Sequence, residues 1–334
     1  MINPTYFLLV ISLSFAVFFV SNAVLSLFSF AFLRLVLVFA ENMQPKRRAE
    51  IIFSSRLFPP VASVILVLFV LLPAYFLHEP YSTKEPIGLT LAALALISIG
   101  SLSFAFYRAL RSWMATRKLQ ANWLSQAEKV EIKTTGVTVF RIQNKFPILA
   151  VVGTFKPRIF IAEQVFETLS EAEIEAAIAH EKGHLAAQDN LKRALLRFCS
   201  NLLFVPYNRK IDQIWAETAE IVADEYAAET VGKIGAVDLA STIIKVSRLI
   251  TPGAKPGLPA GIFLVEKNCG NISSRVRRLI QPERRHKDSF LSKFDLNFSF
   301  ILAFISILLG VWVFEFELYR NVHIVLEIFV RTLR

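Results

Sequence analysis

Residues 169–190 read LSEAEIEAAIAHEKGHLAAQDN, and two histidines in this stretch stand four positions apart. Ser170 and Glu173 form an S-x-x-E capping box, which predicts that a helix begins here. The residues that follow are mostly good helix formers up to the first histidine. Because side chains four apart on a helix project from one face, His180 and His184 can bind one metal ion.

Glu181 directly follows His180 and completes an H-E-x-x-H sequence, the pattern of two zinc ligands and a general base. In such a site Zn²⁺ lowers the pKa of its bound water to about 7, and Glu181 is placed to take the proton. The alternative is a solvated helix with two accidental histidines, which a total of only 5 His disfavours. Gly183 costs about 1 kcal/mol relative to Ala in a helix, but it would let another segment or a substrate backbone come close.

The composition is that of a membrane protein. Hydrophobic residues make up 54% of the 334 positions, and 19% are charged. The net charge is +10, but the basic residues cluster just beyond apolar runs, as the positive-inside rule describes. The lipid bilayer is therefore an expected partner, and direct nucleic-acid binding is not expected. Cys199 and Cys269 lack the spacing of a zinc knuckle or a disulfide framework and are interpreted as thiols.

Four apolar runs reach the roughly 20 residues that a membrane span needs. They cover about residues 6–33, 57–77, 87–107 and 294–316. Basic residues in the loop 42–56 and after residue 107 place these regions in the cytoplasm and both termini outside the cytoplasmic membrane. Pro59 and Pro60 are expected in the first turn of the second span. Residues 317–334 are expected to form a short amphipathic external tail.

Residues 108–293, between the third and fourth spans, are predicted to form a cytoplasmic α+β domain of a mainly α membrane protein. Helices are expected over 108–129, 170–187, 191–205 and 211–230, and strands over 137–143, 148–152 and 158–162. The basic segment 274–293 is interpreted as a positive-inside flank, with a phospholipid-facing or regulatory segment as the alternative.

A catalytic zinc takes three protein ligands, so the two histidines need a third. His286 lies in the basic segment and His323 lies across the membrane, which leaves a carboxylate. The helix 211–230 offers Glu217, Glu220, Asp224, Glu225 and Glu229. Glu220 and Asp224 share a face, so one can bind the metal while the other holds a ligand histidine through its second ring nitrogen.

Together these features resemble the BlaR/MecR-type family of integral-membrane zinc metallopeptidases. The matching elements are a P-x5-G-x3-P strand pair over 147–157, the H-E-x-x-H segment with an Asp five residues later, an E-x-x-x-D pair over 220–224, SSRVRRLI over 273–280, and the three spans before and one after the domain. The resemblance implies a gluzincin-like domain. The sequence departs from the family pattern at Ala223, where Cys is common, and at Val205-Pro206, where Asn-Pro is common.

The resemblance also implies roles for individual residues. His180, His184 and Glu220 would bind one Zn²⁺, Glu181 would be the general base, and Asp224 would hold a ligand. Asp189 matches the family Asp that follows the motif, and either orients a ligand or caps the next helix.

The implied function is endopeptidase cleavage of a protein substrate in signal transduction, such as a cytoplasmic transcriptional repressor or the chain itself. Because only residues 317–334 follow the last predicted span, we expect a form without the extracellular penicillin-binding sensor domain, with any sensor supplied by a separate protein. An exposed edge of the 148–162 strand pair is expected to hold an extended substrate by strand addition.

Two other functions stay open. HtpX-type and CAAX-type membrane proteases share both motifs and act in protein quality control or maturation, but the strand pair before the motif favours the BlaR/MecR type. A catalytically silent scaffold is disfavoured because every required residue is present.

Overall fold

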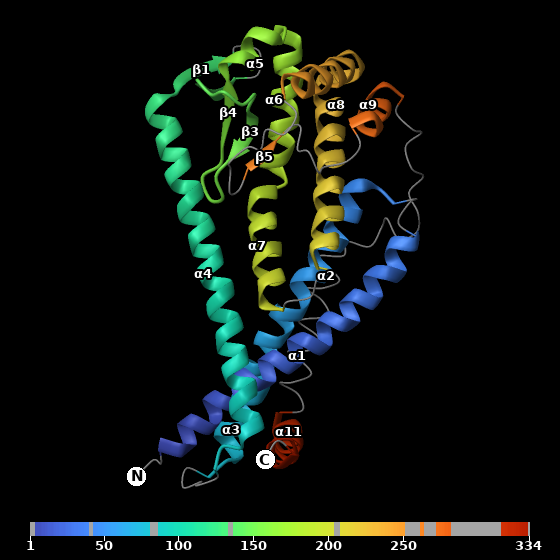
Figure 1. Ribbon diagram of the computed structural model, residues 1–334. Coiled ribbons are helices and arrows are strands. Elements are labelled where there is room, and N and C mark those ends of the chain that lie inside the picture. The colour runs from blue at the N-terminus through green and yellow to red at the C-terminus, as the bar shows by residue number, and fades with distance from the viewer. Residues whose placement is uncertain are drawn as a thin grey trace.

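The computed structural model describes residues 4–39, 43–80, 86–132, 136–203, 208–250, 261–263, 272–281 and 315–332. Figure 1 shows an elongated molecule in which the long helix α4 runs from the end that holds both termini to the end that holds a small sheet and several shorter helices. Nearly all of the predicted fourth span, 294–316, lies outside the described residues.

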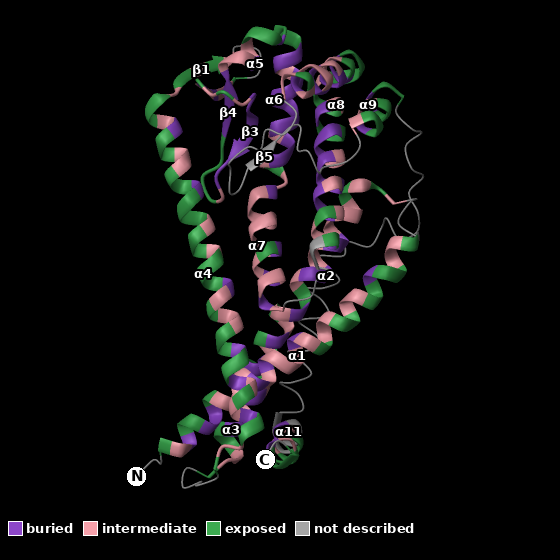
Figure 2. Ribbon diagram, in the orientation of Figure 1, coloured by how far each residue is buried: buried purple, intermediate pink, exposed green. Residues whose placement is uncertain are grey.

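Three helical segments are long and apolar enough to cross a membrane. They are α1 (Pro4–Phe39), the continuous run of α2 (Pro45–Leu66), the π-helical turn η2 (Val67–Leu71) and α3 (Leu72–His78), and α4 (Leu89–Gln126). Figure 2 shows exposed residues along all three. Leu27, Leu77 and Leu96 are 67%, 65% and 68% exposed, which suits contact with lipid.

The segment 42–56, predicted as a loop, is instead largely helical. α2 begins at Pro45 and continues into the apolar run, because Pro fits the first helical position and the Lys, Arg, Ala and Glu that follow favour a helix. Pro59 and Pro60 therefore lie inside the helix rather than in its first turn. Membrane helices tolerate such prolines where neighbouring groups satisfy the freed carbonyls.

The sheet contains β1 (Glu128–Ile132), β2 (Val137–Ile142), β3 (Leu149–Val152), β4 (Arg158–Ala162) and β5 (Gly261–Phe263). Their order is β1-β2-β4-β3-β5, with β2 and β4 parallel and the other neighbours antiparallel. The three predicted strands are confirmed, whereas β1 replaces the end of the predicted helix 108–129 and β5 has no counterpart in the prediction.

The prediction that the 148–162 strand pair has an exposed edge is wrong. β4 lies between β2 and β3, and β3 pairs on its other side with β5, so that Gly261–Phe263 lies opposite Ala150–Val152. A three-residue strand that pairs with a segment more than 100 positions away leaves no local pattern in the sequence.

The remaining helices are α5 (Glu163–Thr168), α6 (Glu171–Ala186), α7 (Asp189–Leu202), α8 (Asn208–Leu249), α9 (Ile272–Ile280) and α11 (Glu315–Thr332). α6 contacts both β3 and α8 (Figure 1), and its apolar residues join the strands in one buried cluster. α8 extends beyond the predicted 211–230 and is kinked at Gly232, whose non-helical backbone with a φ of 73° suits glycine. α11 packs with α3 and the start of α1.

Candidate metal centre

The helix that carries the histidines begins where the sequence predicts. Ser170 is the N-cap of α6: its Oγ accepts a hydrogen bond from the N–H of Glu173, and the Glu173 carboxylate accepts one from the N–H of Ser170. The same carboxylate accepts hydrogen bonds from Ser241 Oγ (2.6 Å) and Lys245 Nζ (2.8 Å) of α8. The capping box therefore also ties the start of α6 to the second half of α8.

Gly183 allows α8 to approach the motif closely. A Cβ placed on Gly183 would lie 3.1 Å from the Cα of Ala223 and 3.3 Å from the Cβ of Tyr226. The segment that comes close to this glycine is therefore α8. Glu220 lies on the same part of α8 as Ala223, and the close packing brings it to the histidines.

His180, His184 and Glu220 converge on one point inside the protein. They are 0%, 2% and 1% exposed, and their ligand atoms lie within 4.8 Å of one another. Nε2 of His180 is 3.2 Å from Nε2 of His184, and each of these nitrogens is 3.6 Å from one Glu220 carboxylate oxygen. Ligand atoms at about 2.0–2.1 Å from a tetrahedral zinc ion lie about 3.3–3.4 Å from one another. The three residues therefore fit Zn²⁺.

Two carboxylates lie against the ring nitrogens that point away from this position. Asp189 Oδ2 is 2.7 Å from His184 Nδ1, and Asp224 Oδ1 is 3.0 Å from His180 Nδ1. Both rings thus turn Nε2 toward the common point, and a carboxylate at Nδ1 fixes the ring orientation and tautomer of a metal ligand. The N-cap of α7 is Gln188, so Asp189 lies inside the first turn of that helix.

Arg275 of α9 completes the surroundings of the site. Its Nε and Nη2 donate to the two oxygens of Asp224 at 2.8 and 2.7 Å, and its Nη1 lies 3.0 Å from Oε2 of Glu220. The side chain is only 4% exposed. For this residue the interpretation of 274–293 as a membrane flank is wrong. Arg275 and Leu279 stand four apart and are both buried, but a run of basic residues does not by itself show which arginine meets a buried carboxylate.

The buried charges of the site stabilise one another. Burial raises the pKa of Glu220 and Asp224, but the Arg275 guanidinium and the neighbouring histidines together outweigh burial. The pKa of Glu220 falls to about 2, and that of Asp224 lies well below its usual range. Burial lowers the pKa of His180, but hydrogen bonds with Asp224 and Glu220 outweigh this effect and raise it to about 9. The ionised carboxylates thus stabilise a cation at His180.

Glu181 is fully buried beside the two histidines. Burial raises its pKa to about 7, although His184 and His180 oppose the shift. A cavity of about 250 Å³ adjoins His184 and is also lined by Val151 of β3 and Asn190 of α7. The cavity gives a small molecule or a peptide group access to His184, beside which lies a carboxylate that titrates near neutral pH.

The comparison with known proteins agrees with this geometry. A family model described as BlaR1 peptidase M56 matches residues 86–258. The chain belongs to this family. The protein is accordingly a membrane-associated peptidase from a family of metallopeptidases. No curated protein matches the chain.

The family match includes most of the residues that the sequence singled out. It begins just before α4 and contains the sheet strands β1–β4 and the helices α5–α8, with both histidines of the motif. Arg275 lies outside the matched residues, so its part in the site rests on the contacts described above.

Proposed function

We propose that the protein is an integral-membrane, zinc-dependent endopeptidase. The observation that carries this proposal is the convergence of His180, His184 and Glu220 at distances that fit zinc, with Glu181 buried beside them. Family membership supports peptide-bond hydrolysis as the reaction.

The proposed mechanism assigns one task to each side chain. A Zn²⁺ ion held by His180, His184 and Glu220 would supply a Lewis acid for the scissile carbonyl and a lowered pKa for the attacking water. Glu181 accepts the proton of this water and passes it to the leaving amine. Its pKa of about 7 suits both transfers near neutral pH.

The proposed substrate is a protein on the cytoplasmic side, such as a transcriptional repressor or the chain itself, cleaved in response to a signal that a separate sensor protein supplies. The basic residues that follow the apolar part of α4 support a cytoplasmic position for the metal centre. An extended substrate can pair with β3 only where β5 is displaced, because β5 occupies that edge over Ala150–Val152.

Two measurements on matched variants test the proposal. The purified wild-type chain and Glu181→Gln should each bind one zinc ion, because the substitution removes the base and keeps the ligands. New protein N-termini should appear in cells that express the wild type and be missing with Glu181→Gln. Glu175→Gln, a partly exposed position on the same helix, should behave as wild type.

The identity of the cleaved proteins decides among the alternatives. Cleavage of a repressor supports signal transduction, whereas cleavage of many misfolded membrane proteins supports an HtpX-like role in quality control. Zinc binding without any difference in N-termini between wild type and Glu181→Gln would contradict the peptidase assignment and favour a scaffold.

A further inference from the structure

A cavity of about 1460 Å³ lies between α4 and α7, on the membrane side of the metal centre. Its lining includes Arg108 and Arg111 of α4 and Arg193 and Arg197 of α7. Among the described residues of the lining, the single carboxylate, Asp212, accepts a hydrogen bond from Ser200 and lies 3.5 Å from Arg56. The cavity wall is therefore strongly basic, and neither the metal centre nor the proposed reaction uses these arginines.

The level of the cavity relative to the bilayer follows from helix geometry. α4 begins at Leu89. A helix rises about 1.5 Å per residue, so about 20 residues cross a hydrocarbon layer of about 30 Å. Arg108 is the first charged residue of α4 and lies about 20 residues from its start. Arg108 and Arg111 consequently lie at the level of the lipid headgroups.

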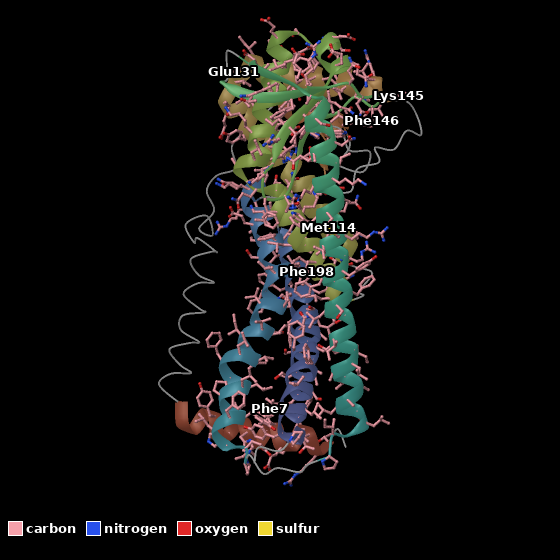
Figure 3. All side chains as sticks on the ribbon, turned by 90° about the vertical axis from the view of Figure 1, so that its left-hand side faces the viewer. Phe7, Met114, Glu131, Lys145, Phe146 and Phe198 are labelled. Atoms are coloured by element: carbon pink, nitrogen blue, oxygen red, sulfur yellow. The ribbon has the colours of Figure 1, made fainter. Side chains whose placement is uncertain are left out.

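The opposite wall of the cavity, formed by α7, has its arginines near the same headgroup level. Phe198 of α7 packs edge-on against Phe106 of α4, with ring centroids 5.1 Å apart. Figure 3 shows Phe198 at mid-height of the molecule, close to α4. Arg197 is the neighbour of Phe198, and Arg193 lies one turn further toward the metal centre. Both walls thus carry aromatic side chains on the membrane side and arginines beyond them.

We propose that this cavity binds an anionic phospholipid. Its phosphate would contact the four arginines, and its acyl chains would lie against Phe104, Phe106 and Phe198, which also line the cavity. Basic pockets between helices on the cytoplasmic side of a membrane bind anionic headgroups. An acidic peptide would match the arginines alone, whereas a phospholipid matches both the basic and the aromatic part.

The bound lipid would lie next to the metal centre. The large cavity shares Thr154, Phe155, Asn190 and Leu191 with the smaller cavity beside His184. Asn190 Nδ2 donates hydrogen bonds to the carbonyl oxygens of Val151 (3.1 Å) and Gly153 (2.9 Å), which attaches α7 to β3. The proposal does not depend on peptidase activity, and its test measures binding alone.

The test uses the full chain, delipidated in detergent, and native mass spectrometry. Short-chain phosphatidylglycerol and phosphatidylcholine of equal chain length are titrated below their critical micelle concentrations. Phosphatidylglycerol should bind more tightly. The double variant Arg108→Gln/Arg111→Gln should bind it about 25-fold more weakly, from roughly fivefold per arginine.

The matched control is Arg117→Gln/Lys118→Gln, which removes the same charge from exposed positions of α4 outside the cavity. It should change the affinity less than twofold, and Arg108→Lys/Arg111→Lys should retain most of the headgroup preference. Equal losses in both Gln doubles would overturn the proposal, because they indicate general surface attraction. Equal binding of the two lipids would overturn it, and so would equally tight binding of glycerol phosphate or an acidic peptide.

Discussion

Replacing Arg275 with Gln isolates the contribution of the one buried cation described at the metal centre. The change removes two hydrogen bonds to Asp224 and the 3.0 Å ion pair with Glu220, whose side chains are 8% and 1% exposed. Losing one partner of a buried ion pair costs about 3–5 kcal/mol, since the other charge stays buried. We expect the free energy of unfolding to fall by this amount. The zinc dissociation constant should rise about 10- to 100-fold, as it does when a metal ligand loses its outer partner.

Competition with a chromophoric chelator measures the zinc affinity of the full chain in detergent, and circular dichroism of the same samples measures the folded fraction. Arg277→Gln is the matched control, because Arg277 is exposed on the same helix. Arg275→Lys should be intermediate, since Lys keeps the charge and loses the two-point contact. The role assigned to Arg275 is refuted if folded Arg275→Gln binds zinc as tightly as Arg277→Gln does.

Three further changes test other parts of the site. Burial raises the pKa of Glu173, but hydrogen bonds from Lys245 and Ser241 outweigh it and lower the pKa from 4.5 to about 2. The ionised carboxylate should therefore add roughly 3 kcal/mol to the free energy of unfolding above pH 4.5, and this stabilisation should be lost as the pH falls toward 2. The difference in unfolding free energy between wild type and Glu173→Gln should shrink over that range, and a constant difference would contradict this. Gly183→Ala should cost about 1–3 kcal/mol and weaken zinc binding, because α8 must move, whereas Gly100→Ala, with no atom within 4 Å of its added Cβ, should do neither. Asp189→Asn should weaken zinc binding about 10- to 100-fold through His184, and an unchanged zinc affinity in the chelator assay would limit Asp189 to a structural role.

The parts of the fold that the sequence predicts correctly are those with local causes. The capping box Ser170–Glu173 requires only contacts three residues apart, and it forms as expected. The strands over 137–162 are bounded by turn residues, including Gly153, whose φ of 116° favours glycine. The E-x-x-x-D spacing puts Glu220 and Asp224 on one helical face, which is a property of any helix.

The features that the sequence does not reveal depend on distant partners. Arg275 is separated from Asp224 by 51 positions, and an Arg in a basic run has the same local signature whether it faces lipid or a buried carboxylate. In the described part of the chain, β5 pairs with β3 alone. Pro59 and Pro60 lie inside α2, although proline normally disfavours a helix interior, because membrane helices tolerate it where neighbouring groups satisfy the freed carbonyls.

The buried charges explain why metal binding and folding should be one equilibrium at this end of the molecule. Among the described residues at the site, four buried acids (Glu181, Asp189, Glu220 and Asp224) accompany the two histidines and one buried guanidinium, that of Arg275. With the acids ionised and His180 protonated, as its raised pKa implies, the cluster carries a formal charge of −2 without a metal, and buried charge of one sign is costly. A divalent cation that displaces the His180 proton would reduce the excess to −1 and join α6 to α8. At a free zinc concentration 100 times the dissociation constant, such binding adds about 2.7 kcal/mol to stability. The contacts that prepare the site for hydrolysis therefore also hold α6, α7, α8 and α9 together.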